Sequence, residues 1–346
     1  MSDRPRSRAT MRDVAAVAGV SVKTVSRVVN DEPAVSPAAA TRVRRAVEQL
    51  GYRHDLTASN LRRSVRRPST VAAMLQDLSN PYSARLLQAI ELVAHERDVA
   101  VVASSLDEEP ERERRLVEGL VRRRVDGLLL MPATTRQDYL LPDLHAGLEA
   151  VFVDRRPHGV DVDSVTVDGS RGAAMAAAHL LAAGHRRIAF LGDLPRIETA
   201  AARCAGFVGE LERQGTPPDP RLVVTGLRTP ADATGALLGL LDLDDPPTAV
   251  FAARNTLAEG AVRALRQRDA AWTTALVGFD DFPLADLLDP PLTVVQQDVE
   301  AIGSEAARRL FARLAGDDSP PCHVELEPVL VTRGSGEIAP SAARRR

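Results

Sequence analysis

From Thr70 onward the chain alternates between short strand-like apolar runs and longer stretches with helical spacing. Runs such as TVAAML (70–75) and VAVVAS (99–104) carry apolar residues on both faces, so both faces must be covered. Strands of this kind separated by helices are typical of a parallel sheet packed between helical layers. The pattern therefore predicts an α/β body.

The alternation begins again at SVTV (164–167), which is followed by helical stretches and by the strand-like runs RIAFLG, TAVFAA and ALVGF. Such a restart predicts two similar α/β lobes with a cleft between them. Two late segments, around Thr293–Val295 and Pro328–Val331, must also be strands of one lobe or the other. The sequence does not assign them.

Polar residues directly follow several of these strand-like runs. In open parallel sheets, ligands bind beyond the carboxyl ends of the strands. The candidates for a ligand site in the cleft are therefore Asp154, Asp193, Arg254, Asn255, Asp280 and Asp281.

The stretch TMRDVAAVAGVSVKTVSRVVN (10–30) predicts two short helices joined by a tight turn. Gly19 can adopt the positive φ that the turn requires, and Ser21 stands at the N-cap of the second helix. Valines at helical spacing form the buried back of that helix. Its outward face carries Val22, Lys23, Ser26, Arg27 and Asn30. A basic, amide-bearing face suits the major groove of DNA, whereas an ordinary αα-hairpin is the alternative.

The N-terminal segment is also basic. Residues 1–67 contain 14 Lys and Arg against 6 Asp and Glu, and the rest of the chain contains 30 against 41. Since only the head is basic, we expect the head alone to meet a polyanion. A third helix, with Ser36 as its N-cap and Pro37 at its first position, completes a small headpiece.

The segment from His54 to Pro68 has two interpretations. A helix this short is unstable by itself in water, so it is either a flexible charged linker or a helix that forms only on DNA. In the second case Leu61 would be an apolar wedge for the minor groove, with arginines near the phosphates.

The chain lacks the residues that several classes of protein need for their function. The chain has one lysine, Lys23, so it has neither a GxxxxGK[ST] phosphate loop nor a Schiff-base lysine in its body. Its two cysteines and seven histidines fit no metal or redox spacing, so we expect no metal and no cofactor. A hydrolase that uses two cleft aspartates as acid and base is the remaining enzymatic alternative. With no signal peptide and no apolar run of 18 residues, we expect a cytoplasmic protein with no membrane partner.

The chain resembles the lactose/galactose repressor family over nearly all of its length. The resemblance rests on residues 10–30, on VSPAAATRVRRAVEQLGY (35–52), and on SNPY (79–82), RCAGF (203–207), VGFDD (277–281) and PPLTVVQQD (290–298) in the body. It implies an all-α helix-turn-helix headpiece and a two-lobed α/β body with parallel sheets, like a periplasmic binding protein. It also implies a homodimeric repressor of double-stranded operator DNA, controlled by a small effector in the cleft. The corresponding domains are 1–55 (headpiece), 56–68 (hinge helix and linker) and 69–340 (effector binding and dimerisation).

The family's functional positions can be carried onto this sequence one by one. Base-reading positions fall on Val22, Lys23 and Arg27. Phosphate-facing positions fall on Thr10, Ser21, Thr24, Asn30 and Ser36. The intercalating leucine matches Leu61, with Ala58 beside it. In the cleft, effector-binding positions match Asp154, Arg203 and Asp280, with Tyr82 as a flanking aromatic residue.

The chain departs from the family pattern in the cleft. Arg254-Asn255 stands where Asn-Asp is usual, and an aromatic wall found in several sugar and purine sensors is absent around Thr229-Pro230. The expected effector is a sugar, a sugar acid, a sugar phosphate or a nucleoside. Arg203 and Arg254 together would suit a carboxylate or phosphate. The alternative is an Arg254–Asp280 ion pair in a degenerate cleft, with the regulator controlled by another signal.

Overall fold

The computed structural model describes residues 9–29, 35–52 and 68–340. The chain divides into two compact units, residues 1–67 and 68–346. Asn30, Ala58 and Leu61 lie outside the described residues, as does most of the segment expected to form the hinge.

The first unit contains three helices, α1 (Met11–Ala18), α2 (Val22–Val29) and α3 (Pro37–Leu50). Gly19 ends α1 with φ of 63°, which permits the tight turn into α2. Ser36 caps α3 by accepting a hydrogen bond from the Ala39 N–H, and Gly51 ends that helix with φ of 60°. Val14, Val25 and Val43, one from each helix, are fully buried against one another.

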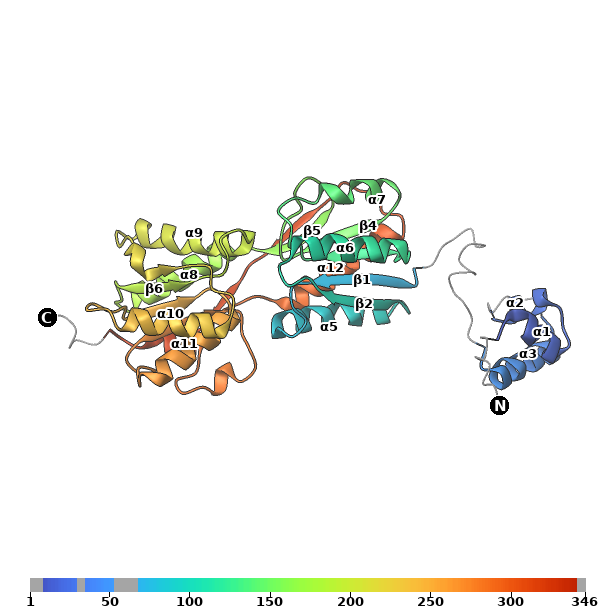
Figure 1. The fold of residues 1–346 in the computed structure, drawn as a ribbon, viewed down its shortest axis with the longest axis horizontal. Coiled ribbons are helices and arrows are strands. Elements are labelled where there is room, and N and C mark those ends of the chain that lie inside the picture. The colour runs from blue at the N-terminus through green and yellow to red at the C-terminus, as the bar shows by residue number, and fades with distance from the viewer. Residues whose placement is uncertain (1–8, 30–34, 53–67, 341–346) are drawn as a thin grey trace, which may run out of the picture. The chain divides into compact units, whose positions relative to one another are not determined.

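The second unit consists of two α/β lobes, each built on a six-stranded sheet (Figure 1). The first sheet has the order β11-β5-β4-β3-β1-β2, and all of its pairings are parallel. Its strands are β1 (Thr70–Leu75), β2 (Ala100–Ser105), β3 (Gly127–Leu130), β4 (Glu149–Val153), β5 (Asp163–Val167) and β11 (His323–Leu326). Helices α5 (Pro81–His95) and α12 (Val299–Leu314) cover one face, and α6 (Pro110–Arg122) and α7 (Leu141–His145) cover the other.

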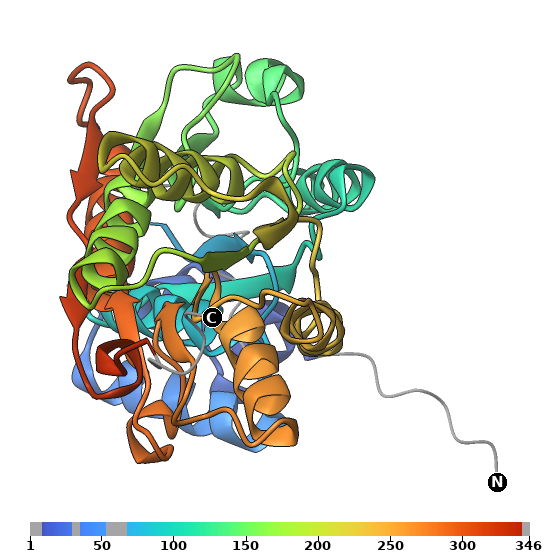
Figure 2. The same cartoon turned by 90° about the vertical axis from the view of Figure 1, so that its left-hand side faces the viewer.

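The second sheet has the order β12-β10-β9-β8-β6-β7. Its strands are β6 (Ile188–Leu191), β7 (Val223–Val224), β8 (Ala249–Ala252), β9 (Ala275–Phe279), β10 (Thr293–Gln296) and β12 (Val329–Val331). Helices α8 (Gly169–Ala182) and α9 (Glu198–Arg213) pack on one face (Figure 2). Helices α10 (Pro230–Leu241) and α11 (Asn255–Gln267) pack on the other. Strand β12 is antiparallel to β10, so the sheet is not entirely parallel.

The chain crosses between the lobes three times, after β5, after β10 and after β11 (Figure 1). The expectation that SVTV begins the second lobe is wrong, because β5 pairs with β4 in the first sheet. The two strands that the sequence left unassigned, β10 and β12, both belong to the second lobe. The cleft therefore lies between two lobes that are connected by three segments of the chain.

Candidate functional site

The headpiece residues expected to meet DNA lie at the start of α2 and beside α3. Val22 is 42% exposed, and Ser21 and Lys23 are exposed next to it. The Ser21 hydroxyl accepts the Thr24 N–H at 3.1 Å, so it caps α2 as the sequence predicts. A surface hollow is lined by Ser21, Thr24, Arg27 and Ser36, together with Val20, Val35 and Ala39.

Two other predicted DNA contacts, Thr10 and Ser26, do not line this hollow. Thr10 forms a capping box with Asp13, whose carboxylate accepts the Thr10 hydroxyl at 2.7 Å. Ser26 is half-buried on α2. The structure thus gathers Ser21, Thr24, Arg27 and Ser36 at one place, and Thr10 stands apart at the start of α1.

All six residues predicted to bind the effector line one cavity between the two lobes. They are Tyr82, Asp154, Arg203, Arg254, Asn255 and Asp280. The cavity is also lined by Asp193, which the strand-end argument singled out, and by Asn80 and Arg155, which it did not. Asp281 forms an ion pair with Arg333 and is not among the lining residues.

Two aspartates occupy equivalent positions in the two lobes. Asp154 follows β4 and Asp280 follows β9, and each has φ of 66°. Their N–H groups donate to Val165 and Val295 on the neighbouring strands at 2.9 and 2.8 Å. Asp tolerates the left-handed region better than most residues. Each carboxylate therefore stands at the carboxyl end of its sheet, at the cavity.

Hydrogen bonds hold both carboxylates in place. The Tyr82 hydroxyl donates to Asp154 at 3.0 Å, and the Gln297 side chain donates to Asp280 at 2.6 Å. Burial raises the pKa of Asp280, while Arg203 and the Gln297 hydrogen bond oppose that rise. Burial, followed by the charge of Asp154, raises the pKa of Tyr82, so this hydroxyl stays protonated and donates.

Three arginines line the cavity, and each lies beside a carboxylate. The Arg254 guanidinium bonds Asp193 at 2.6 Å, so the alternative of an Arg254–Asp280 ion pair is wrong. Arg203 lies 4.0 Å from Asp280, donates to the Ala253 carbonyl, and stacks 3.7 Å from the centre of the Phe279 ring. Arg254 pairs with Asp193 because Asp193 follows the adjacent strand β6 and lies within reach of the Arg254 side chain.

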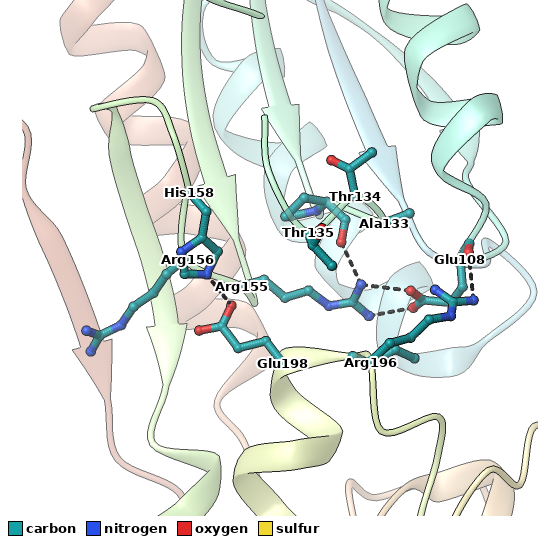
Figure 3. A pocket seen from close by; sticks show the side chains of 11 residues that line it. Glu108, Ala133, Thr134, Thr135, Arg155, Arg156, His158, Arg196 and Glu198 are labelled. Carbon is teal, nitrogen blue, oxygen red and sulfur yellow. Dashed lines mark hydrogen bonds and ion pairs between the residues drawn. The ribbon is translucent and has the colours of Figure 1, made fainter. Parts of the chain in front are cut away.

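Arg155 and Glu108 form a buried ion pair beside a second pocket (Figure 3), and Arg155 lines both that pocket and the first cavity. Arg155 bonds both carboxylate oxygens of Glu108 and also the Pro132 carbonyl. Arg196 and Glu198 reach this pocket from the second lobe, where Arg196 donates to the Glu108 carbonyl and Glu198 bonds His158. The second pocket is thus also bounded by both lobes.

The residues that sequence reasoning missed are Asn80, Arg155 and Gln297. Asn80 had a readable signal, because Asn directly before Pro81 marks a helix N-cap, and α5 indeed begins there. Arg155 and Gln297 gave no such signal, since their roles depend on partners far away in the sequence.

Metal chemistry finds no support in the described part of the chain, where no cluster of three or more His, Cys, Asp or Glu side chains could hold an ion. In the same residues, no helix is long and apolar enough to cross a membrane.

The comparisons with known proteins agree with this architecture. Residues 10–55 match the family model described as bacterial regulatory proteins, lacI family, and residues 177–336 match a periplasmic binding protein-like domain. The regulator GalS of Salmonella typhimurium is 34% identical over 94% of this chain and 96% of its own length. The chain belongs to the lacI family of bacterial regulatory proteins. The resemblance stated from the motifs is therefore confirmed, and this protein is a DNA-binding transcriptional regulator.

Two solved structures extend the likeness to the fold. The complex of the regulator CelR with cellobiose is 33% identical, with a TM-score of 0.69 over 95% of this chain and all of CelR. The lac repressor dimer bound to operator and the anti-inducer ONPF is 26% identical, with a TM-score of 0.83 over 96% of this chain and all of that one. The predicted fold, a helix-turn-helix head with a two-lobed binding-protein-like body, is confirmed.

Proposed function

We propose that this regulator is a homodimeric repressor whose operator affinity is controlled by an uncharged polyhydroxyl molecule, such as a sugar, in the cleft. The charge balance of the cleft carries the proposal. Every arginine that lines the cavity has a carboxylate neighbour. The pairs are Arg155–Glu108, Arg203–Asp280 and Arg254–Asp193.

Asp154 is left without an arginine of its own. Its carboxylate accepts the Tyr82 hydroxyl and lies 3.7 Å from Arg155, which is already engaged with Glu108. The lining residues comprise three arginines and three aspartates, so a carboxylate or phosphate on the effector would add a negative charge to a cavity whose arginines all have carboxylate neighbours. Sugar hydroxyls, in contrast, donate to carboxylates and accept from guanidinium groups at the same time. This argument favours a sugar or a nucleoside over a sugar acid or a sugar phosphate.

The likeness to known regulators supports both the proposed class of effector and the proposed dimer on operator DNA. CelR, of similar fold, has been solved with cellobiose, and the lac repressor has been solved as a dimer on its operator. By extension, the headpiece (1–55) of each protomer would read one half-site, and the hinge (56–68) would connect it to the effector body (69–340). Val22, Lys23 and Arg27 are the proposed base-reading residues. The remaining headpiece and hinge positions named above are proposed phosphate and minor-groove contacts.

An effector screen tests the ligand class directly. Neutral sugars and nucleosides are expected to raise the melting temperature of the full-length protein, and the matching uronates and sugar phosphates are not. Each compound that does so is then titrated against the protein–operator complex. A sugar phosphate that binds more tightly than its parent sugar would contradict the charge argument.

Asp280→Asn is expected to weaken effector binding by about 10- to 100-fold, because it removes a charged acceptor worth about 1.5–3 kcal/mol. Operator affinity without effector should stay within about twofold, since Asp280 lies in the body. Calorimetry measures the first quantity and fluorescence anisotropy with labelled operator the second. Asp286→Asn, an exposed change in the same loop, serves as the control. Equal loss of basal operator binding in Asp280→Asn would argue against the cleft assignment.

Arg27→Ala is expected to cost about 1–3 kcal/mol of operator binding and to relax base preference at one position of the half-site. A binding-site selection experiment compares this variant with Arg44→Ala, which removes the same charge from the exposed side of α3. Arg44→Ala should retain the base preferences. A loss in Arg27→Ala that is uniform across all sequences would assign Arg27 to the phosphates instead.

A further inference from the structure

Asn80 and Asn255 face each other across the cleft. Asn80 precedes α5 in the first lobe, and Asn255 begins α11 in the second. Their side-chain amides form two reciprocal hydrogen bonds, from Asn255 Nδ2 to Asn80 Oδ1 at 2.8 Å and from Asn80 Nδ2 to Asn255 Oδ1 at 3.2 Å. Both residues are buried, with 6% and 3% of their surface exposed.

The backbone fixes the orientation of both amides. Asn80 Oδ1 also accepts the Tyr82 N–H at 2.9 Å, and Asn255 Oδ1 also accepts the Thr256 N–H at 2.7 Å. If either amide were rotated by 180°, its NH₂ group would face a backbone N–H. That N–H and the NH₂ group of the opposite asparagine would then both lose their acceptor. Each oxygen therefore serves its own helix N-terminus and the amide of the opposite lobe together.

The geometry points to a positioning role: Asn80 and Asn255 form an amide clasp that holds the two lobes at the separation in which the effector cavity is assembled. This inference rests on the proposed function, since it concerns the same cleft. Asn255 is itself one of the six residues predicted to bind the effector, and the clasp stands directly beside two further groups of predicted contacts. Tyr82, which bonds Asp154, lies two residues after Asn80, and Arg254, which bonds Asp193, precedes Asn255.

The clasp differs from the other contacts between the lobes. Two of them lie at the second pocket (Figure 3). Arg196, which is exposed, donates one hydrogen bond to the Glu108 carbonyl, and the His158 and Glu198 side chains are 50% and 42% exposed. Exposed pairs contribute little, because water competes for both partners. The amide pair is shielded from water and geometrically strict, so separation of the lobes would break two buried hydrogen bonds at once.

The clasp also sets the affinity for the effector. A ligand that contacts both lobes binds only the assembled cavity, and its apparent Kd rises as the population of that state falls. Breaking both amide hydrogen bonds is expected to raise the apparent effector Kd by about tenfold. Because neither amide is charged, the clasp adds nothing to the charge balance of the cleft.

Serine substitutions separate the clasp from helix capping. Asn80→Ser keeps a good N-cap for α5, but its hydroxyl is too short to reach Asn255. The experiment uses the full-length protein with Cys204→Ser and Cys322→Ser. Spin labels are attached at positions 118 on α6 and 212 on α9, which are exposed positions in different lobes. Pulsed dipolar spectroscopy without effector gives the distance between the lobes, and calorimetry with a sugar from the screen gives the Kd.

Asn80→Ser and Asn255→Ser should each broaden the distance distribution toward longer values and raise the sugar Kd about tenfold. The double variant should add little to either single one, because the two residues act as one unit. His158→Ala, which removes an exposed contact between the lobes, should leave both readouts within about twofold. An unchanged distance distribution in Asn80→Ser would overturn the clasp. That measurement needs no effector, so it stands even if no sugar binds and the proposed ligand class is wrong.

Discussion

Arg155→Met is expected to lower the free energy of unfolding of the body by about 3–5 kcal/mol, because it leaves the Glu108 carboxylate buried without a partner. The two side chains are 9% and 5% exposed, and Arg155 Nη1 bonds Glu108 at 2.8 Å. The pair also ties the end of β4 to the segment after β2, and Asp154 is the residue next to Arg155. Effector affinity should therefore fall together with stability.

The neighbouring residue supplies a matched control. Arg156 bonds Glu325 at 2.8 Å, but these side chains are 53% and 45% exposed. Arg156→Met should consequently cost less than about 1 kcal/mol. Urea unfolding followed by circular dichroism compares the two variants, with the transition of the body fitted separately from that of the headpiece. Similar losses in both variants would show that burial does not control the strength of the Arg155 pair.

The two-lobed α/β body was readable from the sequence because its strands are buried on both faces. Runs such as AVFV and TAVFAA then have to be apolar throughout, and their ends mark the positions where ligands bind. The argument from strand ends brought Asp154, Asp193, Arg254 and Asp280 forward, and these residues line one cavity. Their role in effector binding stays a prediction.

The pairing of strands, the partners of side chains and the crossings between the lobes could not be predicted from the sequence in the same way. The assignment of β5 to the first lobe depends on its pairing with β4 and β11, which no local pattern encodes. Strand β11 and helix α12, both of the first lobe, come late in the chain, after most of the second, and the sequence pattern did not single them out. The choice of Asp193 over Asp280 by Arg254 depends on side-chain reach across adjacent strands. The Asn80–Asn255 contact joins residues 175 positions apart.

The close packing of α8 on α9 depends on Gly206, and a substitution there is expected to have the second large effect. A Cβ atom built at this position would overlap the carbonyl oxygen of Ser170 on α8 and lie 2.7 Å from its carbonyl carbon. Backbone atoms cannot rotate away as a side chain can, so the two helices would have to separate. Gly206→Ala is therefore expected to lower the free energy of unfolding of the body by about 3 kcal/mol.

Gly209 on the same helix is the control, because a Cβ atom there would meet nothing within 4 Å. Gly209→Ala should stabilise the body by about 0.5–1 kcal/mol, since alanine favours the helix interior over glycine. The two variants carry the same chemical change three residues apart, so opposite signs in urea unfolding would isolate the helix contact.

Arg203 lies three residues before Gly206, and its Nη1 donates to the Ala253 carbonyl at the end of β8. Displacing α9 should pull that guanidinium away from Asp280, so Gly206→Ala should also weaken effector binding, whereas Gly209→Ala should not. If Gly206→Ala matched Gly209→Ala in both measurements, α8 and α9 would have room to separate without moving the cleft.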